Sequence, residues 1–114
     1  MNIAKIIDQT NIKKNATATE IKKTCQEAKK YGFRGVCVNP KWVKLVKKEL
    51  VSSEVKVVVL IDPPMGLSSP QKRIKLCQKA KKEGADESDV VMNIVDLKYE
   101  RYSKILNDLK AIAN

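Results

Sequence analysis

Short runs of β-branched residues alternate along the chain with amphipathic segments. The runs cover positions 34–38, 55–61 and 88–94, and a weaker one covers 5–10. Nearly continuous apolar runs of this length are typical of parallel strands that are covered on both faces. The pattern therefore predicts four parallel strands, of which 55–61 is the clearest.

The first amphipathic segment has clear signals for both ends of a helix. Its apolar residues recur from Ile21 to Ala28 at intervals of four and three residues. Thr17 or Thr19 is the predicted N-cap, and Gly32 is the predicted stop. We therefore expect a helix of about three to four turns between the first two strands.

Three further helices are predicted. Asn39-Pro40 and Ser69-Pro70 each place a capping residue before a proline, which favours the start of a helix. The last helix is predicted from about Tyr99 to Ala113, where apolar residues follow one helical face.

This order of elements predicts an α/β fold in a single domain, residues 1–114. Strands that alternate with helices favour right-handed βαβ units and a parallel sheet. A closed (β/α)₈ barrel of the TIM type usually needs about 250 residues, so the chain has room for about half of one. An open doubly wound sheet is the alternative that periodicity alone leaves open.

Composition excludes several kinds of site. The chain has no histidine, so Ser-His-Asp systems, H-E-x-x-H metalloproteases and C₂H₂ zinc fingers are excluded for this chain acting alone. Its three cysteines, Cys25, Cys37 and Cys77, have no C-x-x-C spacing, so neither a disulfide framework nor a metal site is predicted. They are interpreted as reduced thiols of a cytoplasmic protein.

The chain is basic, with 23 Lys and Arg against 13 Asp and Glu and a net charge of +10. A polyanion would be attracted at low salt, but the lysine pairs are spread over separate helices and mixed with glutamates. This favours solvent-facing helix surfaces over a specific nucleic-acid site. The longest apolar run, 57–61, is too short for a membrane helix, and no export signal is predicted at the start of the chain.

One acidic residue lies inside a predicted strand. Alternation along 88–94 places Asp89, Val91 and Asn93 on one face. A carboxylate between valines is costly to bury unless it is paired or used, so a salt bridge and a functional role both remain open for Asp89. The turn at 61–66 lacks the P-loop pattern and is interpreted as a rigid turn. Lys56, the only lysine in a strand, lies at the amino end, which argues against a Schiff base there.

Four segments resemble the 2-deoxyribose-5-phosphate aldolases, and they follow one another in that family's order. The stretch 7–11 is similar to the opening I-D-H-T-x, and 32–40 is similar to G-F-x-x-V-C-V-x-P. The strand at 55–66 resembles one that ends in I-G-F-P-x-G. The most specific match is 84–94, G-A-D-E-S-D-V-V-M-N-I, against G-A-D-E-I-D-M-V-I-N-I.

The resemblance implies a fold, an activity and site residues. Members of that family are (β/α)₈ barrels that cleave 2-deoxy-D-ribose 5-phosphate to glyceraldehyde 3-phosphate and acetaldehyde. They do so through a lysine Schiff base, with no metal or organic cofactor. By resemblance, Asp89 helps to move protons around the carbinolamine and Asp8 belongs to the polar network of the site. Cys37 and Asn93 are expected to line the substrate cavity.

Some positions depart from the family pattern. Asp62-Pro63 stands where Gly-Phe is usual, and Arg73 stands where a lysine is usual. Gln9 replaces a common histidine, and Leu76 a glutamate. Ser88 replaces an apolar residue expected under the helices, where an unpaired hydroxyl would cost about 1 to 3 kcal/mol. These departures are interpreted as relaxed constraint.

The resemblance covers the N-terminal half of the barrel, before the strands that carry the Schiff-base lysine and the phosphate-binding loops. We therefore expect no lyase activity from these residues alone, and exposed sheet edges that lead to self-association or to a partner chain. One alternative is a split aldolase, in which a partner completes the barrel and the phosphorylated sugar binds only then. Another is a basic module that binds nucleic acid.

Overall fold

The computed structural model describes residues 2–113 and contains one sheet of four parallel strands in the order β1-β2-β3-β4. The strands are β1 (Asp8–Asn11), β2 (Gly35–Val38), β3 (Lys56–Ile61) and β4 (Glu87–Val90). Each strand pairs with the next one along the chain. The predicted parallel α/β architecture is confirmed, because neighbouring strands in sequence are neighbours in the sheet, as in a barrel wall.

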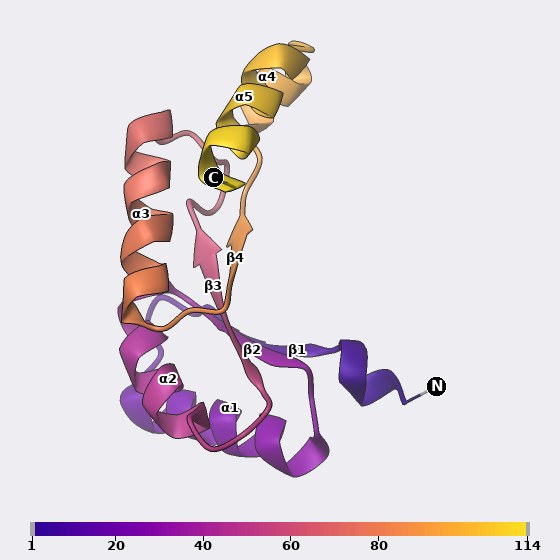
Figure 1. Cartoon of the computed structure of the whole chain (residues 1–114), viewed down its shortest axis with the longest axis vertical. Helices are drawn as coiled ribbons and strands as arrows, with labels where there is room; N and C mark the ends of the chain where they lie inside the picture. The colour runs from indigo at the N-terminus through magenta and orange to yellow at the C-terminus, as the bar shows by residue number, and fades with distance from the viewer. Residues whose placement is uncertain (1, 114) are drawn as a thin grey trace.

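Helices follow the strands in the predicted alternation. Figure 1 shows α1, α2 and α3 along one side of the sheet, with α4 and α5 beyond the upper ends of β3 and β4. The helical elements are η1 (Ile3–Ile6), α1 (Ala18–Tyr31), η2 (Pro40–Trp42), α2 (Val43–Leu50), α3 (Pro70–Glu83), α4 (Ile94–Lys98) and α5 (Tyr102–Ala113). In the described part of the chain, no helix is both long enough and apolar enough to cross a membrane.

The ends of the two longest helices follow from local chemistry. The Thr17 hydroxyl accepts the Glu20 amide at the start of α1, and the Ser69 hydroxyl accepts the Lys72 amide at the start of α3. The glycine that ends α1, Gly32, has a left-handed backbone with φ of 67°. The second helix differs from its prediction: Asn39 makes no side-chain cap, and Pro40 begins a 3₁₀ turn instead.

The main core lies between the sheet and its helices. Alternate residues of β2 and β3 point to this outer face, among them Val36, Val38, Val57 and Val59, and all four are fully buried. They pack against the apolar stripes of α1 and α2, which confirms the predicted helix faces. Burial of these aliphatic side chains is the main force that holds the sheet to its helices.

The opposite side of the sheet, here called the inner face, carries none of these helices (Figure 1). The strand register groups its residues: Thr10 pairs with Cys37, Cys37 with Val58, Val58 with Glu87, and Leu60 with Asp89. Cys37 and Val58 are buried but lie outside the main core. The inner face therefore mixes apolar side chains with carboxylates.

Two strand predictions were wrong in their bounds. β4 ends at Val90, four residues before the predicted end, because the chain leaves the sheet and enters α4. The weak first strand, predicted over 5–10, begins only at Asp8, after the 3₁₀ turn η1. The last helix, predicted from about residue 99, begins at Tyr102.

Ser88 also differs from expectation. It lies on the helix side of β4, as predicted, but it is exposed rather than buried. A hollow of about 640 Å³ between α3, β4 and α5 borders it, lined by Cys77 and Ile112 among others. The expected cost of a buried unpaired hydroxyl therefore does not arise at Ser88.

Candidate functional site

The inner face brings together three of the four predicted site residues. Asp8 begins β1, Cys37 is the third residue of β2, and Asp89 is the third residue of β4. The pairing of alternate residues places all three on the same side of the sheet. The sheet therefore assembles two carboxylates and a thiol from three segments that are spread over positions 8 to 89 of the sequence.

An arginine organises the amino end of this face. The Arg34 Nη1 atom donates to both carboxylate oxygens of Asp8, at 3.0 and 3.2 Å. Its Nη2 atom donates to Glu87 Oε2 on β4. All three side chains are partly exposed, between 28% and 39%. A single guanidinium thus joins carboxylates from the first and the fourth strand.

Asp89 lies close to this cluster and is itself exposed on the inner face. Partial desolvation raises the pKa of Asp89 above its usual value, and the nearby carboxylates of Asp8 and Glu87 raise it further. The positive charge of Arg34 acts in the opposite direction. A carboxyl group with a raised pKa holds a proton more readily, which suits a group that both gives and takes protons.

The thiol of Cys37 has a different character. Burial raises its pKa to about 11, and the negative charges of Asp89 and Asp8 add to the effect. A neutral thiol is a poor nucleophile. Cys37 is therefore suited to line a cavity and unsuited to attack a substrate.

Asn93 does not lie on the same strand face as Asp89, so this part of the prediction was wrong. It is the N-cap of α4, where its side-chain oxygen accepts the Asp96 amide at 3.0 Å. Its side chain lines a hollow of about 550 Å³ at the carboxyl ends of β3 and β4, beside Ser68 and Lys104. Carboxyl ends of strands are where α/β folds place their sites, so Asn93 stays near the expected end of the sheet.

A buried ionic cluster supports that end of the sheet. Arg73 of α3 is 1% exposed, and it donates to Asp62 Oδ2 at 2.7 Å and to the Val91 carbonyl at 2.7 Å. It also pairs with Asp108 of α5 at 3.0 Å. The Ser68 hydroxyl and amide both donate to Asp62. The cluster therefore fixes the loop after β3 and the segment after β4 to two helices.

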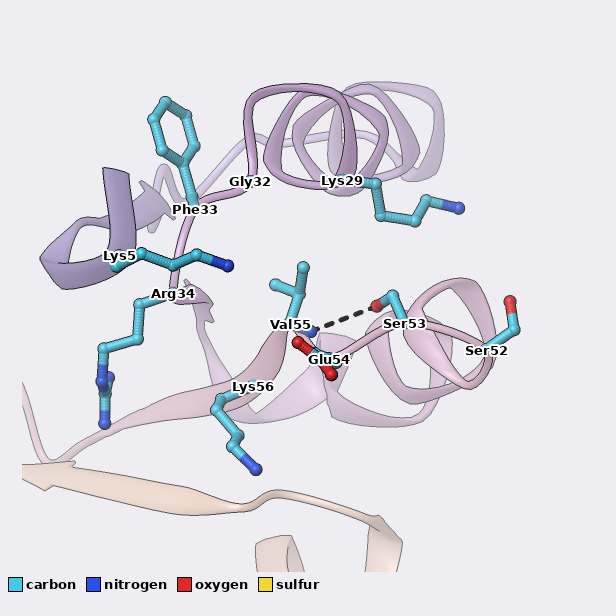
Figure 2. Close-up of a pocket in the computed structure, with 10 residues that line it drawn as sticks. All are labelled: Lys5, Lys29, Gly32, Phe33, Arg34, Ser52, Ser53, Glu54, Val55 and Lys56. Carbon is cyan, nitrogen blue, oxygen red and sulfur yellow. Dashed lines mark hydrogen bonds between the residues drawn. The ribbon is translucent and has the colours of Figure 1, made fainter. Parts of the chain in front are cut away.

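Another hollow, of about 430 Å³, lies at the amino ends of β2 and β3 and is lined by several basic residues (Figure 2). Lys5 points into it, whereas Lys29 and Lys56 extend away from it and Arg34 extends toward β4. The Lys29 ammonium donates to the Glu49 carbonyl. Because the positive charges diverge, this hollow does not form an anion site. Within residues 2–113, no cluster of three or more Cys, Asp or Glu side chains could hold a metal ion.

Sequence reasoning missed two residues of the inner face. Glu87 is two positions before Asp89, so strand alternation places it on the same face, and that signal was available. Arg34 carries no such signal, because its partners lie 26 and 53 positions away.

The comparisons with known proteins identify the family of the chain. The family model for DeoC/LacD family aldolases matches residues 2–114. The chain belongs to this family. The resemblance stated from sequence motifs is thereby confirmed.

Relatives in this aldolase family are similar along the whole chain. The deoxyribose-phosphate aldolase of Clostridium tetani is 40% identical over 114 residues, which is 100% of this chain and 53% of that protein. The deoxyribose-phosphate aldolase of Caldicellulosiruptor saccharolyticus is 43% identical over 119 residues, covering 98% of this chain and 54% of the relative. The chain therefore spans about half the length of the curated relatives it matches.

A solved structure also matches the chain over about half of its own length. A crystal structure from Coccidioides immitis, assigned to the deoxyribose-phosphate aldolases, superposes with a TM-score of 0.94 at 36% identity. The match covers 97% of this chain and 44% of that one. The four βα units thus have the shape of half of an aldolase barrel, which confirms the predicted fold.

Proposed function

We propose that residues 1–114 supply the carboxylate half of a deoxyribose-phosphate aldolase site. The observation that carries the proposal is the gathering of Asp8, Cys37 and Asp89 on the inner face of a chain that belongs to the aldolase family. The substrate would be 2-deoxy-D-ribose 5-phosphate, as the names of the relatives suggest. The reaction would be its retro-aldol cleavage.

In this proposal each of the three side chains has a different role. Asp89 moves protons to and from the substrate oxygens, which its raised pKa and open position support. Asp8 holds the polar network at the base of the site and stays bound to Arg34. Cys37 provides a neutral wall beside the substrate. The Schiff-base lysine and the phosphate site, by family resemblance, belong to the later strands of the barrel.

The open edges of the sheet support a requirement for those later strands. Among residues 2–113, no strand pairs with the outer edge of β1 or of β4. Apolar side chains are also exposed beyond the carboxyl end of β4, on the last two helices and the segment before them: Met92, Ile94, Leu97 and Leu106. We propose that a complementary half barrel, in the same or another polypeptide, covers this surface. The same proposal places the protein in the cytoplasm, where its three free thiols would remain reduced.

The test of this function is a reconstitution. The chain is assayed for cleavage of 2-deoxy-D-ribose 5-phosphate alone and after mixing with the second half of the Clostridium tetani aldolase. Borohydride trapping and intact-mass analysis report which polypeptide carries the adduct. We expect cleavage only in the mixture, with the adduct on the second half.

Variants then test the assigned roles. Asp89→Asn in the mixture is expected to reduce the cleavage rate by at least about 100-fold, because proton transfer is lost. Glu54→Gln, which changes an exposed carboxyl group just before the amino end of β3, is the matched control and should leave the rate unchanged. Full activity of the Asp89→Asn mixture, or an adduct on the isolated chain, would contradict the proposal.

A further inference from the structure

Arg34 directly precedes β2 and is hydrogen-bonded to residues of the other three strands. Its amide donates to the Ile7 carbonyl just before β1, and its carbonyl accepts the Lys56 amide at the start of β3. Its guanidinium binds Asp8 on β1 and Glu87 on β4. The backbone of Arg34 is therefore fixed by hydrogen bonds on both sides. This fixes the position from which its side chain extends to the two outer strands.

The Asp8 carboxylate lies directly over a glycine. A Cβ atom added at Gly35 would come within 2.8 Å of Asp8 Oδ1 and 3.1 Å of the Lys56 carbonyl. The carboxylate thus occupies space that any other residue at position 35 would fill. Arg34 holds it there with two hydrogen bonds to the two oxygens. This placement needs both neighbours, Gly35 to leave the space and Arg34 to bind the carboxylate.

β1 has little else to fix it in the sheet. Its four residues, Asp-Gln-Thr-Asn, are all polar, and none of them is buried. Besides the backbone ladder to β2, the side chains of β1 form hydrogen bonds with one other side chain on each face, as far as residues 2–113 show. These are Asp8 to Arg34 on the inner face, and Gln9 Nε2 to Glu27 Oε2 at 2.8 Å on the side of α1. Loss of either contact should loosen this strand.

We propose that Arg34 is a positioning residue of the inner face: it fixes the Asp8 carboxylate over Gly35 and ties β1 to β4 through Glu87. Its role in catalysis rests on the proposed aldolase function, in which Asp8 belongs to the site. The positioning itself is a property of the folded chain. Bidentate and charge-assisted hydrogen bonds give Arg34 a geometric precision that a lysine at this position would not provide.

The same guanidinium affects the charge around Asp89. The groups that act on Asp89 are the carboxylates of Asp8 and Glu87, which raise its pKa, and Arg34, which lowers it. Removal of the guanidinium would leave three carboxyl groups on one face without their shared cation. Asp89 would then hold its proton to a higher pH, in addition to any loosening of β1.

The experiment compares Arg34→Met, Arg34→Lys and the matched control Gln9→Ala in the full chain. Backbone amide exchange reports the opening of β1, and the NMR titration of the Asp89 carboxyl carbon reports its pKa. We expect about tenfold faster exchange across Asp8–Asn11 in Arg34→Met, and a titration of Asp89 that moves to higher pH. Arg34→Lys should loosen β1 but keep the titration near that of the native chain, because the charge remains.

Gln9→Ala separates positioning from simple loosening. It removes the other side-chain contact of β1 without changing any charge on the inner face, so exchange should rise while the Asp89 titration stays in place. The inference about Arg34 is wrong if Arg34→Met leaves both exchange and titration unchanged. It is also wrong if Gln9→Ala moves the titration as far as Arg34→Met does.

A double-mutant cycle tests the shared guanidinium directly. Asp8→Asn and Glu87→Gln should be non-additive in stability when Arg34 is present, and the coupling energy should change in the Arg34→Met background, where only repulsion between the two carboxylates remains. Additivity in both backgrounds would overturn the proposed link between β1 and β4. None of these readouts requires activity, so a failed reconstitution would refute the proposed function and leave the positioning role to be judged on its own measurements.

Discussion

Arg73 and Asp62 form a buried ion pair, with Nη1 of Arg73 at 2.7 Å from Oδ2 of Asp62. The two side chains are 1% and 11% exposed. Both positions depart from the family pattern, and in the structure they depart together: the carboxylate at 62 binds the guanidinium at 73. Each of these two positions therefore has a specific partner in the fold, while their interpretation as relaxed constraint stays a prediction.

Arg73→Met is expected to lower the free energy of unfolding by about 3 to 5 kcal/mol, because it leaves Asp62 and Asp108, which are 11% and 14% exposed, without their buried cation. Urea unfolding followed by circular dichroism measures the change. Arg101→Met is the control, since Arg101 is 48% exposed and its pair with Asp96 should contribute at most about 1 kcal/mol. Equal losses in the two variants would show that burial adds nothing to the Arg73 pair. If Arg73→Met does not fold, Arg73→Lys gives the same comparison with a smaller expected loss.

The Asp62 carboxyl group should make the fold sensitive to acid. Burial opposes its ionisation, but hydrogen bonds from Ser68 and Arg73 outweigh burial and hold the pKa of Asp62 below its usual range. A carboxyl group with a lowered pKa in the folded state stabilises the fold above its unfolded pKa, and this contribution is lost as the pH falls through the folded value. The loss should begin near pH 4 and continue below it.

Asp62→Asn tests this dependence. The variant has no carboxylate at position 62 to take up a proton in this range, so its free energy of unfolding should fall less steeply below about pH 4 than that of the native chain. Unfolding in urea at pH 7, 5, 4 and 3 gives both profiles. Parallel profiles down to the lowest pH would mean that Asp62 has the same pKa in the folded and unfolded chain.

Asp89→Asn should stabilise the fold at neutral pH, in contrast to the loss of the Asp62 carboxylate. The raised pKa of Asp89, caused by desolvation and then by the charges of Asp8 and Glu87, means that its ionised form destabilises the fold at neutral pH. Asp89→Asn should therefore raise the urea midpoint at pH 7, and the gain should disappear as the pH falls below about 4. Glu54→Gln is the control and should show no such change. A lower midpoint for Asp89→Asn at pH 7 would show that the carboxylate is a stabilising partner.

Local signals in the sequence were sufficient for the longest elements. Ala18–Tyr31 and Pro70–Glu83 each combine a capping hydroxyl, an apolar stripe and a terminal glycine, and these act within a few residues of one another. The end of β4 could not be predicted in this way. Alternation continues past Val90, but the Ile94 amide binds the Met65 carbonyl and Asn93 caps a helix. A contact between segments almost 30 residues apart decides that boundary.

The candidate site could also be predicted only where local signals in the sequence were sufficient. Asp89 and Glu87 share a face because of the strand period, which can be read from the sequence. The link from Arg34 to Glu87 spans 53 positions and depends on how β2, β3 and β4 are staggered, which the sequence pattern does not specify. The exposure of Ser88 could not be predicted from the sequence either, because it depends on how the helices pack. Ser88 borders the hollow between α3 and α5, and these two helices are joined by the pair of Arg73 and Asp108, whose positions are 35 residues apart.

Two glycines have almost the same φ angle but different surroundings. Comparing them distinguishes the cost of a left-handed backbone from the cost of a steric clash with neighbouring atoms. Gly32 and Gly66 have φ of 67° and 68°, but an added Cβ at Gly32 would have nothing within 4 Å. At Gly66 it would lie 2.5 Å from the Val91 carbonyl oxygen and 2.6 Å from that of Met92. Gly66→Ala must therefore displace the backbone that follows β4, whereas Gly32→Ala has only the left-handed backbone to accommodate.

Gly32→Ala is expected to cost about 1 kcal/mol, the usual penalty for a side chain in the left-handed region. Gly66→Ala should cost at least about 2 kcal/mol more, because it also forces the β3–α3 loop away from residues 91 and 92. Urea unfolding gives both values, and amide exchange at Val91 and Ile94 locates the change, since their amides bind the Ile61 and Met65 carbonyls. Equal costs would mean that the loop moves freely. In that case the carboxyl end of the sheet would not be held in the position that the proposed site requires.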